Sequence, residues 1–168
     1  MKLVDEDLKR YSSKKEMPKV QKYLRKYQDT EIRLIKIFYK VLYRYFRKTA
    51  HIEMDINTQI KGGLYIGHPY SITINPKVQI GKNCNIHKGV TIGQENRGKR
   101  EGVPIIGNEV WIGINAVIVG GITIGDDVLI APNAWVNCDV PDYSIVFGNP
   151  CTIKYNAYAT EGYINRKI

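Results

Sequence analysis

The stretch VPIIGNEVWIGINAVIVGGITIGDDVLIAPNAWV, residues 103–136, decides the fold of this chain. An aliphatic side chain recurs in it at every sixth position, from Ile106 to Val136. A helix repeats every 3.6 residues and a strand every two, so neither explains a period of six. A coil with three flat sides does, because each hexapeptide then supplies one short strand and one corner. The aliphatic side chains would stack inside the resulting prism.

The same period runs through the preceding part of the chain. Its members are Ile74, Ile80, Ile86, Ile92, Ile106, Ile112, Ile118, Ile124, Ile130 and Val136. Gly, Asn and Asp fill many positions between them, and these residues tolerate the backbone angles that tight corners need. Because such coils bury a core only by stacking, we predict about four to five coils between residues 60 and 147.

The series is interrupted at residues 94–105, which are polar, basic and rich in glycine. Long loops that leave a rigid scaffold are usually functional. We therefore expect a functional loop here. The domain division that follows is an N-terminal region over residues 1–50, the coiled domain over 51–154, and a tail over 155–168.

Residues 1–50 differ from the rest in charge and in period. Lys and Arg outnumber Asp and Glu there by 15 to 6, so the net charge of +9 belongs to this segment. Residues 31–48 predict a basic amphipathic helix, and residues 16–28 a weaker one. The apolar stripe of the first consists of Ile32, Ile35, Tyr39, Leu42 and Phe46.

Two partners suit this stripe. It can pack on the rest of the protein or on another subunit, or it can lie on an anionic membrane surface. No nucleic-acid-binding motif accompanies the basic charge, so we expect no nucleic-acid partner. The opening residues lack the apolar core of a signal peptide. We expect a cytoplasmic protein, with peripheral contact at the inner membrane face through residues 31–48 as the alternative.

The cysteines and histidines show no metal-binding spacing. Cys84, Cys138 and Cys151 form no CxxC pair, so we interpret them as buried free thiols. The histidines His51, His68 and His87 are not spaced as a three-histidine zinc site would require. We expect no metal cofactor.

Several motifs within residues 51–154 resemble the hexapeptide-repeat acyltransferases. They are GLYIGH (63–68), NCNIHKGVTIG (83–93), VPIIGNEVWIGINAVIVGG (103–121), IAPNAWVNCDVP (130–141) and GNP (148–150). They are similar to serine acetyltransferases and to acetyltransferases of polysaccharide gene clusters. The resemblance implies a mainly β fold, a left-handed parallel β-helix. It also implies acetyl-CoA as co-substrate and a homotrimer with active sites between subunits.

The resemblance implies His68 as the catalytic base, oriented by an acidic residue fifteen positions upstream. That residue is Glu53, with Asp55 as the nearby alternative. A neutral imidazole can take the proton of an acceptor hydroxyl, and a carboxylate behind it stabilises the imidazolium. His87, outward-pointing after Ile86, is expected to contact substrate or, alternatively, to be the base itself.

The family binds coenzyme A along the groove between two prisms, near the later coils. Carried over to this chain, the contacts fall at Ile114, Ala131, Pro132 and Asn137. Lys154 is a candidate for a phosphate contact, and an ordinary solvated lysine is the alternative.

The chain departs from the serine acetyltransferase pattern where the acceptor binds. Those enzymes carry an aspartate just before the catalytic histidine and an Arg-His pair after the loop, whereas this chain has Gly67 and Gly102-Val103. The ammonium and carboxylate groups of an amino-acid acceptor would therefore find no oppositely charged side chain at these positions. We therefore expect a sugar or polysaccharide hydroxyl as acceptor, with serine as one alternative and a non-catalytic scaffold as another.

Overall fold

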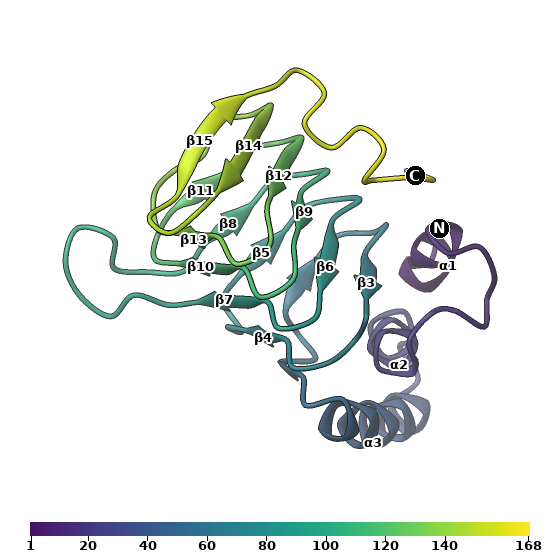
Figure 1. The fold of residues 1–168 in the computed structure, drawn as a ribbon. Helices are drawn as coiled ribbons and strands as arrows, with labels where there is room; N and C mark the ends of the chain where they lie inside the picture. The colour runs from purple at the N-terminus through teal and green to yellow at the C-terminus, as the bar shows by residue number, and fades with distance from the viewer.

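The protein is a parallel β-helix with three α-helices at one end (Figure 1). A computed structural model describes all residues, 1–168. Its strands form three flat sheets, and each strand pairs with its counterpart one coil away. The predicted prism is confirmed in this respect.

The sheets, named A, B and C, follow one another around each coil. Sheet A contains β1 (Glu53–Met54), β4 (Thr73–Ile74), β7 (Thr91–Gly93), β10 (Val117–Val119) and β13 (Trp135–Val136). Sheet B contains β2 (Gln59–Ile60), β5 (Gln79–Ile80), β8 (Ile105–Ile106) and β11 (Thr123–Ile124). Sheet C contains β3 (Tyr65–Gly67), β6 (Asn85–His87), β9 (Trp111–Ile112), β12 (Val128–Ile130), β14 (Ser144–Phe147) and β15 (Thr152–Tyr155). The last pair, β14 and β15, is antiparallel and closes the solenoid.

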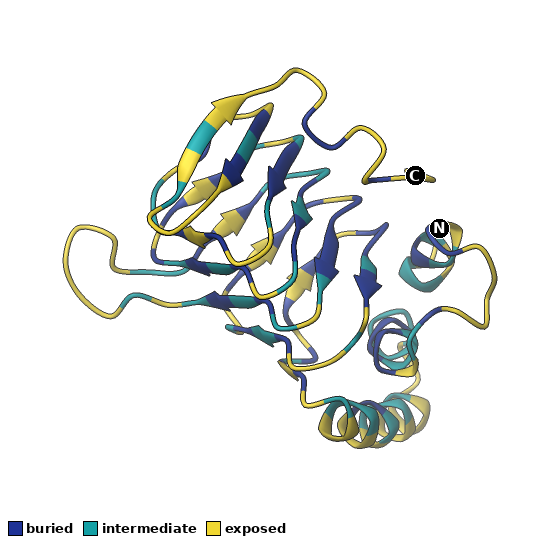
Figure 2. Cartoon of the chain, in the orientation of Figure 1, coloured by how far each residue is buried: buried dark blue, intermediate teal, exposed yellow.

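The core is the interior of the prism (Figure 2). All the sixth-position residues named above are buried, and none exposes more than 3% of its surface. Cys84 belongs to a second buried series, two positions before the first, and is completely enclosed. Cys138 and Cys151 are only half-buried, so the expectation of buried thiols is wrong for them. Both lie outside the two inward-facing series, and their sulfur atoms are 3.8 Å apart.

Three helices precede the β-helix: α1 (Leu3–Lys9), α2 (Lys19–Gln28) and α3 (Arg33–Thr49). The sequence predicted α2 and α3 but missed α1. The face of α3 that packs on the protein is centred on buried Tyr43, beside half-buried Tyr39 and Phe46. Ile32 and Ile35 of the predicted stripe remain exposed, so only part of the stripe packs on the protein. None of these helices is both long enough and apolar enough to cross a membrane.

Side chains from the helices bond to the backbone of the first coil, which has no coil beneath it. Arg25 donates to the carbonyl oxygens of Ile60 and Lys61, at 2.7 and 2.8 Å. Asp7 accepts the backbone N–H of Leu64 at 2.9 Å. From α3, the Tyr43 hydroxyl donates to the carbonyl oxygen of Met54 at 2.7 Å. Backbone groups that a further strand would pair are thus satisfied by buried side chains.

The loop and the tail take different courses. Figure 1 shows the segment between β7 and β8 projecting away from the prism. Within it, Glu95 and Gly102 form an antiparallel bridge, and Arg100 pairs with Glu95. The C-terminal tail returns toward the N-terminus, where Arg10 donates to the carbonyl oxygen of Asn165 at 2.9 Å.

Candidate functional site

Most of the predicted site residues lie along one edge of the prism, where the chain leaves sheet C and turns into sheet A. We call it the C–A edge and define it as residues 67–68, 87–88, 113–114 and 131–132. Gly67 pairs with His87, and Ile86 pairs with Ile112, which pairs with Ile130. The carboxyl ends of these strands therefore stack, and the residues that follow them form a row along the solenoid.

His68 follows β3 directly and stands exposed on this edge. Its backbone is left-handed, with φ of 55°, which turns the chain sharply out of sheet C. Its side chain makes no hydrogen bond or ion pair within residues 1–168. The imidazole is therefore free to bind an acceptor, and nothing in the protomer fixes its orientation.

Glu53 does not reach His68 within the protomer. It begins β1 on the outer face of sheet A, in register with Thr73. Its carboxylate shares a shallow cavity with Arg47 and Asp55 and makes no hydrogen bond or ion pair with His68. Asp55 instead accepts the backbone N–H of Asn57 at 2.8 Å. The spacing of fifteen residues could not show this, because the residue one coil from Glu53 is Thr73.

His87 ends β6 and is half-buried on the C–A edge. Its Nδ1 lies 2.8 Å from the carbonyl oxygen of Ile112. A carbonyl oxygen only accepts, so a neutral His87 carries its proton on Nδ1 and leaves Nε2 as an acceptor. Burial lowers the pKa of His87, and nearby His68 acts in the same direction, while the Ile112 carbonyl opposes them. Burial and the neighbouring His68 thus both favour the neutral form of the ring.

An aromatic cluster supports this ring. Trp111 packs on His87 with ring centroids 4.7 Å apart, and Tyr163 meets the other side of Trp111 at 5.0 Å. The sequence did not identify Trp111 or Tyr163 as parts of the site. Tyr163 comes from the C-terminal tail, and no repeat or motif links it to the coils.

The backbone of Gly67 lies directly against the His87 ring. A Cβ at position 67 would stand 2.5 Å from Cδ2 and 2.8 Å from Nε2 of His87. Any side chain at this position would push the ring away. The imidazole thus takes the space that a side chain immediately before His68 would need.

The residues predicted to bind coenzyme A lie in three separate places. Ile114, Ala131 and Pro132 continue the C–A edge above the two histidines, and Ile114 and Ala131 are half-buried. Lys154 lies near the top of sheet C, where its Nζ is 5.6 Å from the ring centroid of Phe147. Asn137 follows β13 at the far side of sheet A and is not part of this edge.

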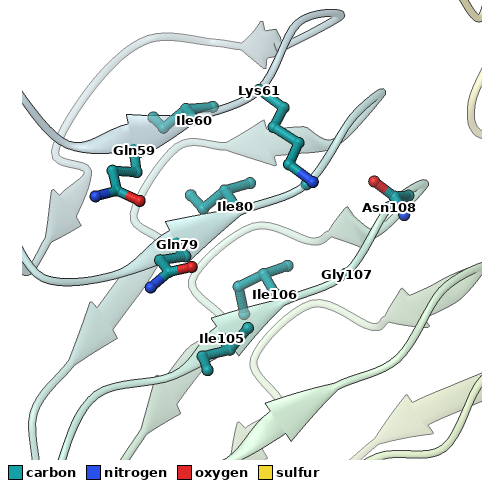
Figure 3. A pocket seen from close by; sticks show the side chains of 10 residues that line it. Gln59, Ile60, Lys61, Gln79, Ile80, Ile105, Ile106, Gly107 and Asn108 are labelled. Atoms are coloured by element: carbon teal, nitrogen blue, oxygen red, sulfur yellow. The ribbon is translucent and has the colours of Figure 1, made fainter.

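A depression on sheet B lies on a different face (Figure 3). It is lined by residues of β2, β5 and β8 and by the corners after them, and Lys61 is its single charged residue. It contains no histidine, cysteine or carboxylate. His68 and His87 lie instead on the C–A edge. No three His, Cys, Asp or Glu side chains gather closely enough to hold a metal.

Comparison with known proteins identifies relatives of the coiled region. The family described as "Bacterial transferase hexapeptide (six repeats)" matches residues 104–138. A serine acetyltransferase of Helicobacter pylori is 37% identical over 98 residues, which are 58% of this chain and 57% of that protein. One from Staphylococcus xylosus is 41% identical over 101 residues, 59% of this chain and 46% of that protein. The chain thus spans about half the length of the curated relatives it matches.

Solved structures extend the likeness to most of the chain. The serine acetyltransferase of Neisseria gonorrhoeae, solved in complex with serine, superposes with a TM-score of 0.71 and 26% identity. That alignment covers 90% of this chain and 67% of the other. The Brucella abortus strain S19 enzyme gives a TM-score of 0.74 at 23% identity, over 92% and 68% of the two chains, which shows the fold alone. The fold is the left-handed parallel β-helix, as predicted. The chain resembles the hexapeptide-repeat acyltransferases, and the members it matches are serine acetyltransferases.

Proposed function

We propose that this protein is an acetyl-CoA-dependent O-acetyltransferase. The observation that carries the proposal is the placement of His68 and His87 in neighbouring coils on the C–A edge of a fold shared with serine acetyltransferases. Two imidazoles stand beside a row of corners along which a long, thin co-substrate can lie. We assign acetyl-CoA to that row, with Ile114, Ala131 and Pro132 as contacts.

The reaction needs one proton acceptor and no covalent enzyme intermediate. His68 takes the proton of the acceptor hydroxyl as its oxygen attacks the thioester carbonyl carbon. The carbon–sulfur bond then breaks, and the leaving thiolate takes the proton back from the imidazolium. The products are the O-acetyl ester and free coenzyme A. Backbone N–H groups at the corners stabilise the developing oxyanion.

Serine is the first acceptor proposed, because the curated relatives are serine acetyltransferases. A sugar hydroxyl is the second candidate, and a specific observation favours it. His87 fills the space beside Gly67, and Val103 packs its apolar side chain against the core. Neither position offers a charge to an amino acid's ammonium or carboxylate group.

Release of free thiol from acetyl-CoA distinguishes these acceptors. The purified protein is assayed with serine and, separately, with a panel of nucleotide sugars and oligosaccharides. His68→Ala should abolish turnover, whereas His51→Ala, which removes the exposed histidine that packs on Tyr70, should not. Turnover with serine alone would support the first acceptor, and turnover with a carbohydrate alone the second. No turnover and no calorimetric binding of acetyl-CoA would contradict the enzymatic proposal and favour a scaffold.

We further propose a homotrimer with the active sites between subunits. Glu53 makes no bond to His68 within one protomer, so a second protomer can complete the site. Light scattering should then report about three times the chain mass of 19.2 kDa. A monomer with full activity would contradict this arrangement.

A further inference from the structure

The outer face of α3 exposes a continuous apolar stripe. Its members are Leu34, Ile37, Phe38, Val41 and Tyr45, and each exposes between 52% and 79% of its surface. These positions fall on one side of a helix of 3.6 residues per turn. Figure 2 shows α3 at the margin of the molecule with much of its surface exposed.

The stripe is distinct from the face by which α3 packs on the protein. Tyr43 is buried, and Phe46 stacks on Tyr23 of α2 with ring centroids 5.4 Å apart. The helix thus carries apolar side chains on two sides, and the protomer uses only one of them. Large apolar side chains that cluster on an exposed face mark a surface that binds something.

The charge beside the stripe has a single sign. Between Ile32 and Ile52 the chain contains no aspartate or glutamate. By helical rotation, Arg33, Lys40 and Arg44 lie along one border of the stripe, and Lys48 follows in the last turn. A partner must therefore offer an apolar surface together with negative charge.

We propose that this face of α3 lies on an anionic phospholipid bilayer. The apolar stripe enters the acyl boundary, and the basic side chains remain at the headgroup phosphates. A second copy of the same face fits poorly, because two basic helices would meet with no carboxylate between them. The proposal concerns a surface away from the C–A edge and is independent of the acetyl-transfer proposal.

Vesicle flotation of the full chain tests the proposal. Vesicles of phosphatidylcholine with phosphatidylglycerol should retain the protein at low salt, and pure phosphatidylcholine should not. Phe38→Gln with Val41→Gln should weaken retention by about tenfold or more, since two apolar anchors are lost. The matched control is Ile105→Gln with Tyr158→Gln, which removes two exposed apolar side chains elsewhere and should leave retention unchanged.

A charge series completes the test. Replacing Arg33, Lys40 and Arg44 by Gln should abolish the preference for anionic vesicles. The same change at Lys61, Lys77 and Lys82, which lie in the β-helix away from the C–A edge, should preserve it. No retention of the wild type, or equal retention on both vesicle types, would overturn the proposal. It would also be overturned if the Phe38/Val41 variant dissociated an oligomer, as judged by light scattering, without changing vesicle binding. Acetyl transfer, measured on the same preparations, is expected to be unaffected.

Discussion

The imidazole of His87 lies against the backbone of Gly67, so close that a Cβ on Gly67 would be 2.5 Å from its Cδ2 atom. The ring is also held from the other side, because its Nδ1 bonds to the carbonyl of Ile112. These two contacts fix both the tautomer and the direction of the free Nε2. The contact with Gly67 can be tested by a single substitution.

Gly67→Ala should displace the His87 ring and break its bond to Ile112. We expect kcat/KM for acetyl transfer to fall by about 100-fold, since misplacing a catalytic or positioning group by 1 Å can cost that much. The control is Gly93→Ala, because a Cβ there meets nothing closer than Val119 at 3.4 Å. When Gly67→Ala is added to the His87→Ala variant, kcat/KM should fall little further. Wild-type activity in Gly67→Ala would contradict a role for the ring.

The stability of the protein should decrease as the pH falls below about 6.5, in part because of His87. Burial lowers the pKa of His87 below its ordinary value of 6.5. The unfolded chain therefore binds a proton in a pH range where the folded chain does not, and unfolding becomes easier as acid is added. The contribution is at most about 1.4 kcal/mol per pH unit. Urea denaturation should show that the free energy of unfolding differs less between pH 5.5 and pH 7.5 in His87→Gln than in the wild type. If the difference is the same in both, His87 does not contribute to the pH dependence. His51→Gln serves as the control.

The buried ion pair between Asp7 and Arg25 should be essential for the N-terminal helices. Both side chains are fully buried, with the atoms Oδ2 and Nε 2.7 Å apart. Asp7→Ala leaves a buried guanidinium without its partner and should cost about 3–5 kcal/mol of unfolding free energy. The exposed pair of Lys167 and Glu109 is the comparison, and Glu109→Ala should cost about 0.5 kcal/mol or less. Denaturant titrations that give equal losses for the two variants would refute this ranking.

The three thiols should differ in reactivity. Burial raises the pKa of Cys84 to about 12, so its thiolate is scarce at neutral pH. Iodoacetamide should label half-buried Cys138 and Cys151 in the native protein, and Cys84 only after unfolding. Peptide mass spectrometry measures each site separately. Labelling of native Cys84 at the rate of the other two would show that the first coils open readily.

The sequence predicted the β-helix because its period is a property of the backbone geometry. Ile112 and Ile118 stand six residues apart, so a coil with one strand per hexapeptide stacks both inside the prism. It did not predict α1, because this helix is short and its most important residue is a buried aspartate, Asp7. An acidic residue that follows two others in a polar segment gives no sign that it will be buried.

The candidate site was predictable only in part, because the repeat gives positions along the chain but not the contacts between neighbouring coils. His68 and the later edge residues share positions in the repeat, so the period brings them together. The contact between Gly67 and His87 crosses from one coil to the next, and only the register between β3 and β6 reveals it. Glu53 was assigned by counting residues along the chain, whereas the coil places Thr73 next to it.

The bonds from Asp7, Arg25 and Tyr43 to the first coil have a consequence for how the molecule behaves in a crowded solution. A row of unpaired strand groups at the end of a solenoid is a template on which another chain could add. Here buried side chains occupy that row at the first coil. Addition of another chain's strand, and with it end-to-end growth into fibres, is thereby blocked at that end of the solenoid.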